Sequence, residues 1–198
     1  MVLAYHVIWG AHGFWLPNDP RGSWSIYVGN RKLHQFGPAT KVTTRRSVAH
    51  TAHDAQLRLA AKEVLEYPAV TLTGVQARAV GTGFLHYVKR SGITVWACSV
   101  MPDHVHAVIA RHRYQIEQVV NLMKGDATRQ LLAEGLHPFA ERRRPNGRLP
   151  ACWARNPWAV YLDTEEDIVR AIQYVEENPV KAGLPPQRWK CVTPYDPV

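Results

Sequence analysis

The stretch MPDHVHAVIA, residues 101–110, holds the pattern that decides the fold. From His104 onward it reads as a buried β-strand in which one apolar residue separates two histidines. Side chains point alternately to the two faces of a strand, so His104 and His106 are predicted to share one face, opposite to Val105. Two neutral imidazoles on one face supply half of a metal site, and the remaining ligand has to come from another part of the chain.

Further strand and helix signals surround this stretch. Residues 4–16 and 93–100 are rich in β-branched and aromatic side chains, which predicts strands. Thr73 and Gln76 have the spacing of a capping box at the start of a helix. The core elements expected are a strand within 4–16, a helix over 74–90, strands over 93–100 and 104–111, a helix over 115–134 and a strand ending at 162. This order predicts an α+β fold of the ferredoxin-like (RRM-like) type, an antiparallel sheet with helices on one face.

An insertion is expected after the first strand. Residues 24–46 are polar, contain glycine and proline breakers and show no sustained period. Residues 53–67 place apolar side chains on one helical stripe and stop before Pro68, so the insertion is predicted to carry a helix. We therefore expect a single domain over 1–198, with an inserted segment at about 24–67 and a C-terminal helix at about 165–178.

The C-terminal helix carries two polar side chains that can act together. Thr164 and Asp167 have capping spacing at its start, and Pro179 is expected to end it. Its apolar stripe consists of Ile168, Ala171, Ile172 and Val175. Tyr174 and Asn178 lie off this stripe and one turn apart, so both can reach a single point in space.

The chain is strongly basic. Lysine and arginine total 24 against 16 aspartate and glutamate, which gives a formal net charge of +8 and a pI near 9.6. This balance favours a polyanionic partner, and nucleic acid is the first candidate.

Compartment signals are few. The three cysteines, Cys98, Cys152 and Cys191, are far apart and form no C-x-x-C pair, as is typical of reduced thiols rather than of a disulfide framework. The first residues do not resemble a signal peptide, and no run of about 18 apolar residues occurs. We expect a soluble, cytoplasmic protein with no membrane partner.

Three segments together resemble a known family. The HVH strand preceded by MPD, the early strand YHVIWGAHG and the late helix IQYVEENPVKAGL resemble the single-tyrosine HUH transposases, and among them the REP-associated tyrosine transposases. The three motifs stand in the order of the family and span residues 5–184. The resemblance implies an HUH endonuclease type of ferredoxin-like fold. It also implies a metal-dependent single-stranded DNA endonuclease and strand transferase that acts on hairpin-containing DNA.

Matched position by position, the resemblance also implies roles for individual residues. His104, His106 and Asn178 would hold a divalent metal, Mg²⁺ or Mn²⁺, and Tyr174 would be the nucleophile that forms a 5′-phosphotyrosine intermediate. Glutamine fills the place of Asn178 in some relatives. Two imidazoles and one amide suit Mn²⁺ better than Mg²⁺, because Mg²⁺ prefers oxygen ligands. Asp103 is a conjectural general base.

Contacts to DNA are expected from the basic and aromatic side chains. Candidate phosphate contacts are Arg111, Lys124, Arg142, Arg143, Arg144, Arg148 and Lys181. Candidates for stacking on unpaired bases are Trp153, Trp158 and Tyr161, since single-strand binders commonly use aromatic platforms.

Other functions are open at this stage. A histidine-triad nucleotide hydrolase is set aside because Val108 stands where that motif needs a third histidine. A domesticated protein that binds or regulates DNA hairpins without cleaving them is the main alternative. A relaxase-type nickase would share the chemistry, but the sequence after Tyr174 favours the transposases. The oligomeric state, monomer or homodimer, is open.

Overall fold

The computed structural model describes residues 1–19, 28, 31–38 and 52–196. Its centre is an antiparallel sheet of β1 (Ala4–Gly10), β2 (Val95–Val100), β3 (His104–Ala110) and β4 (Trp158–Leu162), in the order β2-β3-β1-β4. Helix α2 (Gly74–Ser91) connects β1 to β2, and α3 (Ile116–Ala133) connects β3 to β4. The predicted ferredoxin-like fold is confirmed.

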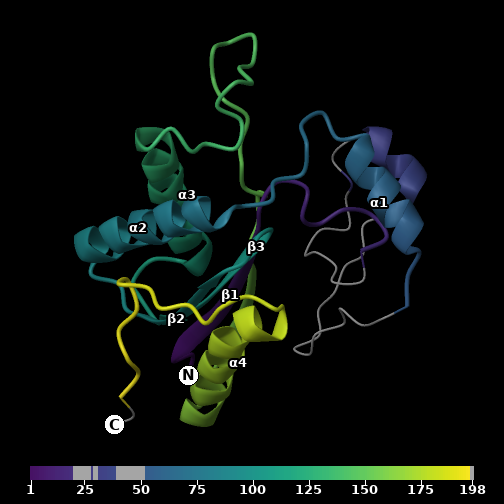
Figure 1. Ribbon diagram of the computed structural model, residues 1–198. Helices are drawn as coiled ribbons and strands as arrows, with labels where there is room; N and C mark the ends of the chain where they lie inside the picture. The colour runs from purple at the N-terminus through teal and green to yellow at the C-terminus, as the bar shows by residue number, and fades with distance from the viewer. Residues whose placement is uncertain (20–27, 29–30, 39–51, 197–198) are drawn as a thin grey trace.

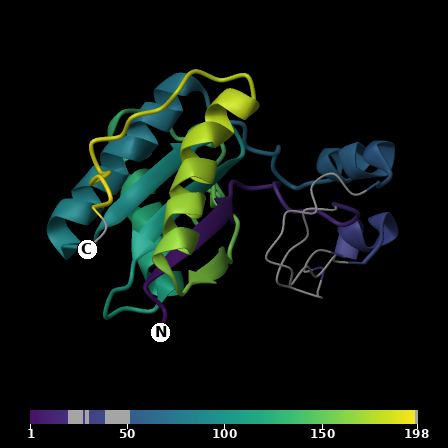
Figure 2. The same ribbon diagram turned by 90° about the horizontal axis from the view of Figure 1, so that it is seen from below.

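Helices cover both faces of the sheet. Figures 1 and 2 show α2 and α3 on one face and α4 (Glu165–Lys181) across the other. Facing α2 and α3, the strands contribute Val7, Trp9, Val105, Ala107 and Ile109 to the larger core. Facing α4, they contribute Ala4, Ala97, Val108 and Leu162, which pack on Ile168, Ala171 and Val175. The two core helices thus share one face as predicted, and the opposite face belongs to α4, which the sequence pattern did not place.

Both ends of α2 and the start of α4 follow the predicted signals, whereas the end of α4 does not. The Thr73 hydroxyl accepts from the Gln76 amide at 3.3 Å, and the Gln76 side chain accepts from the Thr73 amide at 2.9 Å, which completes the capping box. Helix α4 does not stop before Pro179, however, but continues to Lys181. A proline removes only the hydrogen bond of its own amide, and the next turn keeps its bonds, since Ala182 N donates to Asn178 O at 3.1 Å.

Residues 184–196, the C-terminal strap, return from α4 along β2. The Gln187 side chain accepts from the amide and donates to the carbonyl of Val100, both at 2.8 Å. Further along, Thr193 N donates to Val95 O at 2.8 Å, and Cys191 is buried in the larger core. The strap therefore holds the chain that leaves α4 against the sheet.

The insertion packs as a small satellite beside the sheet, at the right of Figures 1 and 2. It contains the 3₁₀ helix η1 (Arg31–Phe36) and helix α1 (Ala55–Glu63), which is shorter than the predicted helix over 53–67. A separate apolar cluster of Leu16, Leu33, Phe36 and Ala61 joins the two. Residues 24–27, 29–30 and 39–51 of the predicted insertion lie outside the described residues.

The cysteine prediction is confirmed, since Cys98, Cys152 and Cys191 are all buried and free. Within the described ranges, no helix is long and apolar enough to cross a membrane.

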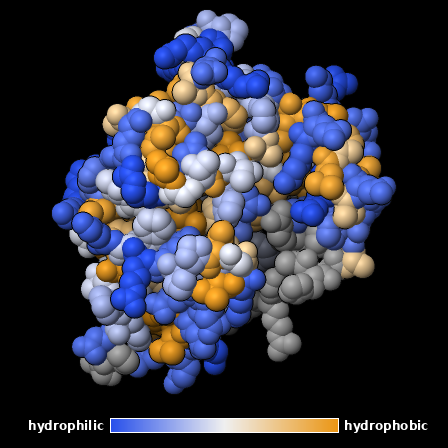
Figure 3. Space-filling view, in the orientation of Figure 1, coloured by the Kyte–Doolittle hydropathy of each residue, from blue (hydrophilic) through white to orange (hydrophobic). Residues whose placement is uncertain are grey.

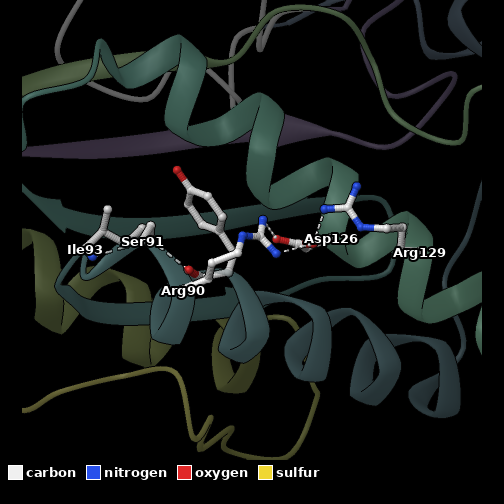
Figure 4. Close-up of polar contacts among 6 residues, drawn as sticks. Arg90, Ser91, Ile93, Asp126 and Arg129 are labelled. Atoms are coloured by element: carbon white, nitrogen blue, oxygen red, sulfur yellow. Dashed lines mark hydrogen bonds and ion pairs between the residues drawn. The ribbon is translucent and has the colours of Figure 1, made fainter.

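A buried carboxylate joins the two core helices. Asp126 of α3 is 4% exposed and accepts hydrogen bonds from Arg90 of α2, at 2.6 Å to Nη2, and from Arg129. Figure 4 shows its carboxylate between the two guanidinium groups. Burial raises the pKa of Asp126, but the hydrogen bonds from Arg90 and Arg129 and the charges of these two residues outweigh it and hold the pKa below its usual value. Close by in the same interface, Gly83 is required, because a Cβ there would lie 2.6 Å from the Ala127 Cα.

Asp126→Asn tests this contact, because asparagine keeps the shape and removes the charge. We expect the free energy of unfolding to fall by about 2 kcal/mol at pH 7, since hydrogen bonds to charged groups contribute about 1.5–3 kcal/mol. The folded-state pKa of Asp126 is depressed, so the stabilisation is present above the unfolded pKa of about 3.9 and is lost as the pH falls through the folded pKa. Urea unfolding at pH 7 and pH 3 should show the difference from wild type shrinking in acid.

The matched control is Glu134→Gln, which removes the charge of a carboxylate paired with the exposed Arg78. Exposed pairs contribute at most about 1 kcal/mol, so this variant should stay close to wild type at both pH values. An Asp126→Asn deficit of equal size at pH 7 and pH 3 would contradict the assignment.

Candidate active site

The register between β1 and β3 collects histidines on one face of the sheet. Ile8 lies opposite His106, and Gly10 lies opposite His104. Residues two apart on a strand share a face, so His6 of β1 joins the face of the two predicted ligands. This is the face that α4 covers.

Each ring of the predicted pair is held through its Nδ1 atom. His104 Nδ1 donates to Asp103 Oδ1 at 2.6 Å, and His106 Nδ1 lies 3.1 Å from His6 Nε2 in a second hydrogen bond. The rings of His104 and His106 meet edge to face, with centroids 4.8 Å apart. Because the Nδ1 atoms are engaged, the Nε2 atom of each ring is the one that can serve a ligand. The conjectured base Asp103 thus orients His104 in this structure.

Phe14 supports His104 from the side. Its ring stacks on the imidazole with centroids 4.7 Å apart and an interplanar angle of 26°. Gly10 makes this approach possible, since a Cβ at residue 10 would lie 2.6 Å from the Phe14 Cβ. Glycine is therefore required where β1 passes beneath this pair of rings.

Burial keeps the other two histidines uncharged near neutral pH. His106 is 4% exposed, and burial, followed by the nearby His104 and His6, lowers its pKa well below the ordinary value. Burial also lowers the pKa of His6 to about 4. Neutral imidazoles keep a lone pair on one ring nitrogen, which is the form that binds metals.

Tyr174 lies directly against this histidine cluster. Its ring centroid is 5.6 Å from that of His6 and 5.6 Å from that of His106, in edge-to-face contacts. The side chain remains 39% exposed, and Lys181 Nζ lies 5.9 Å from the tyrosine ring centroid. The structure thus brings together the tyrosine and the histidine pair, which lie far apart in the sequence. It also brings in Lys181.

Asn178 lies one turn of α4 beyond Tyr174. Its Nδ2 atom is buried and, among the described residues, has no hydrogen-bond partner. The described residues contain no group of three or more His, Cys, Asp or Glu side chains arranged to hold a metal. Two imidazole Nε2 atoms and the Oδ1 atom of Asn178 are nevertheless ligand types that fit a divalent cation. The unpaired Nδ2 atom is a hydrogen-bond donor and would not itself bind the ion.

The comparisons with known proteins identify the family of the chain. The sequence profile of the family described as "Transposase IS200 like" matches residues 64–178, which is more than half of the chain. The chain belongs to the IS200-like transposase family. No curated protein matches its sequence.

Two solved structures are similar to this IS200-like transposase in overall arrangement. One is a REP-associated tyrosine transposase bound to a REP hairpin, with 12% identity and a TM-score of 0.48, covering 91% of this chain and 68% of that chain. The other is a candidate transposase from Deinococcus radiodurans R1, with 14% identity and a TM-score of 0.39, covering 89% of this chain and 91% of that chain.

The transposase carries an exposed arginine loop, residues 141–148, which projects at the top of Figure 1 and is hydrophilic in Figure 3. It holds four of the predicted phosphate contacts, Arg142, Arg143, Arg144 and Arg148, all exposed. Arg143 Nη1 donates to Gly147 O at 2.9 Å, which closes the loop on itself. Arg144 lies over the Tyr67 ring at 5.8 Å.

Arg111 lies at the end of β3 that is opposite to His104. It lines an open cavity of about 800 Å³ together with Tyr5, Ser91, His112, Arg113, Tyr114 and Gln115. Seven residues of strand separate Arg111 from His104, or about 23 Å. The basic cavity therefore lies at the end of β3 that is far from His104.

The three predicted stacking residues differ in exposure. Trp153 is 9% exposed, and its Nε1 donates to Thr128 Oγ1 at 3.2 Å, so it belongs to the core. Tyr161 is 45% exposed and packs edge-on against Tyr5, at the same end of the sheet as the cavity. Trp158 is partly exposed.

One predicted DNA contact is wrong. Lys124 is 6% exposed, and its Nζ donates to Ala154 O at 2.9 Å and to Arg155 O at 3.0 Å. Burial lowers its pKa to about 8. The ammonium ties α3 to the segment ahead of β4, because those two carbonyls need donors, and it is not available to a phosphate.

Sequence reasoning missed His6. The histidine stands in the quoted strand YHVIWG, but a lone histidine there carried no signal. Its place became visible only with the register that sets it diagonally from His106.

Lys124→Met separates a structural role from DNA contact, because methionine keeps the apolar stem and removes the donors. Each buried carbonyl left without a partner costs about 1–3 kcal/mol, so we expect the free energy of unfolding to fall by about 2 kcal/mol or more. Urea unfolding measures this loss. The salt dependence of DNA affinity should stay as in wild type. A stable variant with a shallower salt dependence would return Lys124 to the DNA contacts.

Proposed function

We propose that this transposase is a metal-dependent single-stranded DNA endonuclease and strand transferase. It acts at hairpin-containing DNA through a 5′-phosphotyrosine intermediate on Tyr174. The observation that carries the proposal is the ring contact of Tyr174 with His106, at 5.6 Å between centroids. A partly exposed tyrosine in ring contact with His106, whose neighbour His104 also has an available Nε2 atom, is suited to phosphodiester cleavage by tyrosine.

The reaction is an exchange of one phosphodiester for another. The Tyr174 hydroxyl oxygen attacks the scissile phosphorus, the bond from phosphorus to O3′ breaks, and the phenolic proton passes through solvent to the leaving O3′. Tyr174 is in contact with solvent, so water can carry this proton. The products are a 5′-phosphotyrosyl strand and a free 3′-OH. Another 3′-OH can reverse the step and join strands without ATP, because the link conserves the phosphodiester.

The metal, Mg²⁺ or Mn²⁺, would be held by His104, His106 and Asn178. When bound, it supplies positive charge to a non-bridging phosphate oxygen, where negative charge builds in the transition state. Asp103 keeps the His104 ring in position through the bond to Nδ1. Lys181 Nζ pairs with Glu177 Oε2 at 2.7 Å beside the tyrosine ring, and it would bind a phosphate there by exchanging this exposed ion pair.

In this structure α4 lies on the sheet of its own chain and the strap holds its far end, which supports a site assembled within one chain. A monomer would therefore be competent for cleavage. DNA would be held by the arginine loop, the basic cavity and Lys181, and the partner would be single-stranded DNA with hairpins.

The direct test is covalent capture. Labelled hairpin DNA from the flanks of the protein's own gene, incubated with Mn²⁺ or Mg²⁺, should give a slow-migrating adduct on a denaturing gel. We expect the adduct to disappear in Tyr174→Phe, which keeps the ring and removes the nucleophile, and in His106→Ala.

A mixture of the two variants tests whether one chain suffices for the reaction. A mixture of Tyr174→Phe and His106→Ala should stay inactive, because each site is complete in one chain. DNA binding without adduct, in both metals and with several hairpins, would favour a domesticated, non-cleaving hairpin-binding protein.

The arginine loop is tested by the salt dependence of hairpin affinity. Arg142→Ala and Arg148→Ala should each lower the slope of log affinity against log salt by about 1, because each lost phosphate contact releases one counterion fewer. Fluorescence anisotropy at several salt concentrations measures the slope. Arg78→Ala is the control, since Arg78 is equally exposed but paired with Glu134, and it should leave the slope unchanged. Equal slopes in all the variants would remove the loop from the DNA interface.

A further inference from the structure

His6 is a partly buried histidine that the proposed metal and tyrosine chemistry does not use. It lies on β1, stacked on His106 with centroids 5.4 Å apart and an interplanar angle of 26°. Tyr174 contacts its ring from above at 5.6 Å. A polar ring in contact with both a predicted metal ligand and the predicted nucleophile calls for a role.

The hydrogen bond between His6 Nε2 and His106 Nδ1 holds a single proton, and its position decides what His106 can do. If His6 Nε2 carries the proton, His106 is protonated on Nε2 and has no lone pair there for a metal. If His106 Nδ1 carries it, His106 Nε2 is bare and can bind a metal. The two arrangements have the same heavy-atom distance of 3.1 Å.

The neighbouring ring shows the second arrangement. His104 Nδ1 donates to the Asp103 carboxylate, which has no proton of its own to give when ionised, so the neutral form of His104 has a bare Nε2. Ligand histidines commonly donate their other ring N–H to an acceptor, and this partner fixes the tautomer and the ring orientation. A carboxylate plays that part for His104, and among the described residues His6 is the hydrogen-bond partner of His106 Nδ1.

We propose that His6 is a positioning residue that accepts the Nδ1 proton of His106 and so holds His106 Nε2 bare and aimed at the metal. This inference rests on the proposed function, because it assigns His6 a purpose in that site. His6 itself touches neither metal nor phosphate. It acts through His106, and the contact of its ring with Tyr174 couples the orientation of the ligand to that of the nucleophile.

The test uses two matched variants of His6. His6→Phe keeps an aromatic ring between His106 and Tyr174 but offers no acceptor. His6→Gln replaces the ring by a side chain whose carbonyl oxygen can accept the Nδ1 proton. Far-UV circular dichroism and thermal unfolding confirm that each variant is folded before it is compared.

The first readout is the tautomer of His106 in the metal-free protein, from long-range ¹H–¹⁵N correlation of the imidazole nitrogens. We expect the Nδ1–H form in wild type and in His6→Gln, and its loss in His6→Phe. The second readout is titration with Mn²⁺ alone, followed by the EPR signal of free Mn²⁺. We expect His6→Phe to bind Mn²⁺ about 10- to 100-fold more weakly than wild type, and His6→Gln to recover most of that loss.

The outcomes separate the inference from the function on which it rests. An Nε2–H tautomer in a wild-type protein that binds Mn²⁺ would overturn the inference alone, as would a folded His6→Phe with wild-type Mn²⁺ affinity. A wild type that forms no DNA adduct and binds no Mn²⁺ would overturn the proposed function and the purpose given to His6 with it.

Discussion

The pairing of β1 with β3 in a single register is the constraint on which the site depends. It sets Gly10 opposite His104 and Ile8 opposite His106, so that three histidines meet on the face beneath α4. A slip of one residue would turn every side chain of a strand to the other face. The apolar side chains Val7 and Trp9 prevent such a slip, because it would take them out of the larger core. Burial of apolar surface therefore positions the polar site.

Helix α4 is amphipathic, and it brings Tyr174 to this surface because the tyrosine lies at the edge of its apolar stripe. Ile168, Ala171 and Val175 pack on the sheet, and Tyr174 lies at the margin of that contact, half open to solvent. A nucleophile needs both conditions, because it must be held near the imidazoles and still be reached by a DNA strand. Anchoring at both ends, by the Thr164 cap and the C-terminal strap, keeps the helix in place.

Periodicity and capping were enough to predict the order of the elements, and alternation was enough to set His104 and His106 on one face. These signals involve only residues that are close together in the sequence, and the structure follows them. The place of α4, the part of His6 and the burial of Lys124 depend on contacts between segments far apart in sequence. His6 needed the β1 and β3 register, and Lys124 needed the carbonyls of residues 154 and 155. Pro179 led to a predicted end of α4 that is too early, because the last turn of a helix can continue past a proline whose own hydrogen bond is lost.

The C-terminal strap also decides how this sheet meets other chains. Strand β2 is an edge of the sheet, and an exposed edge has unpaired amides and carbonyls that can pair with an extended segment of another chain. Gln187 occupies both backbone groups of Val100, and Thr193 occupies the carbonyl of Val95. The segment that anchors the tyrosine helix thus also caps this edge, and guards the protein against strand-to-strand aggregation.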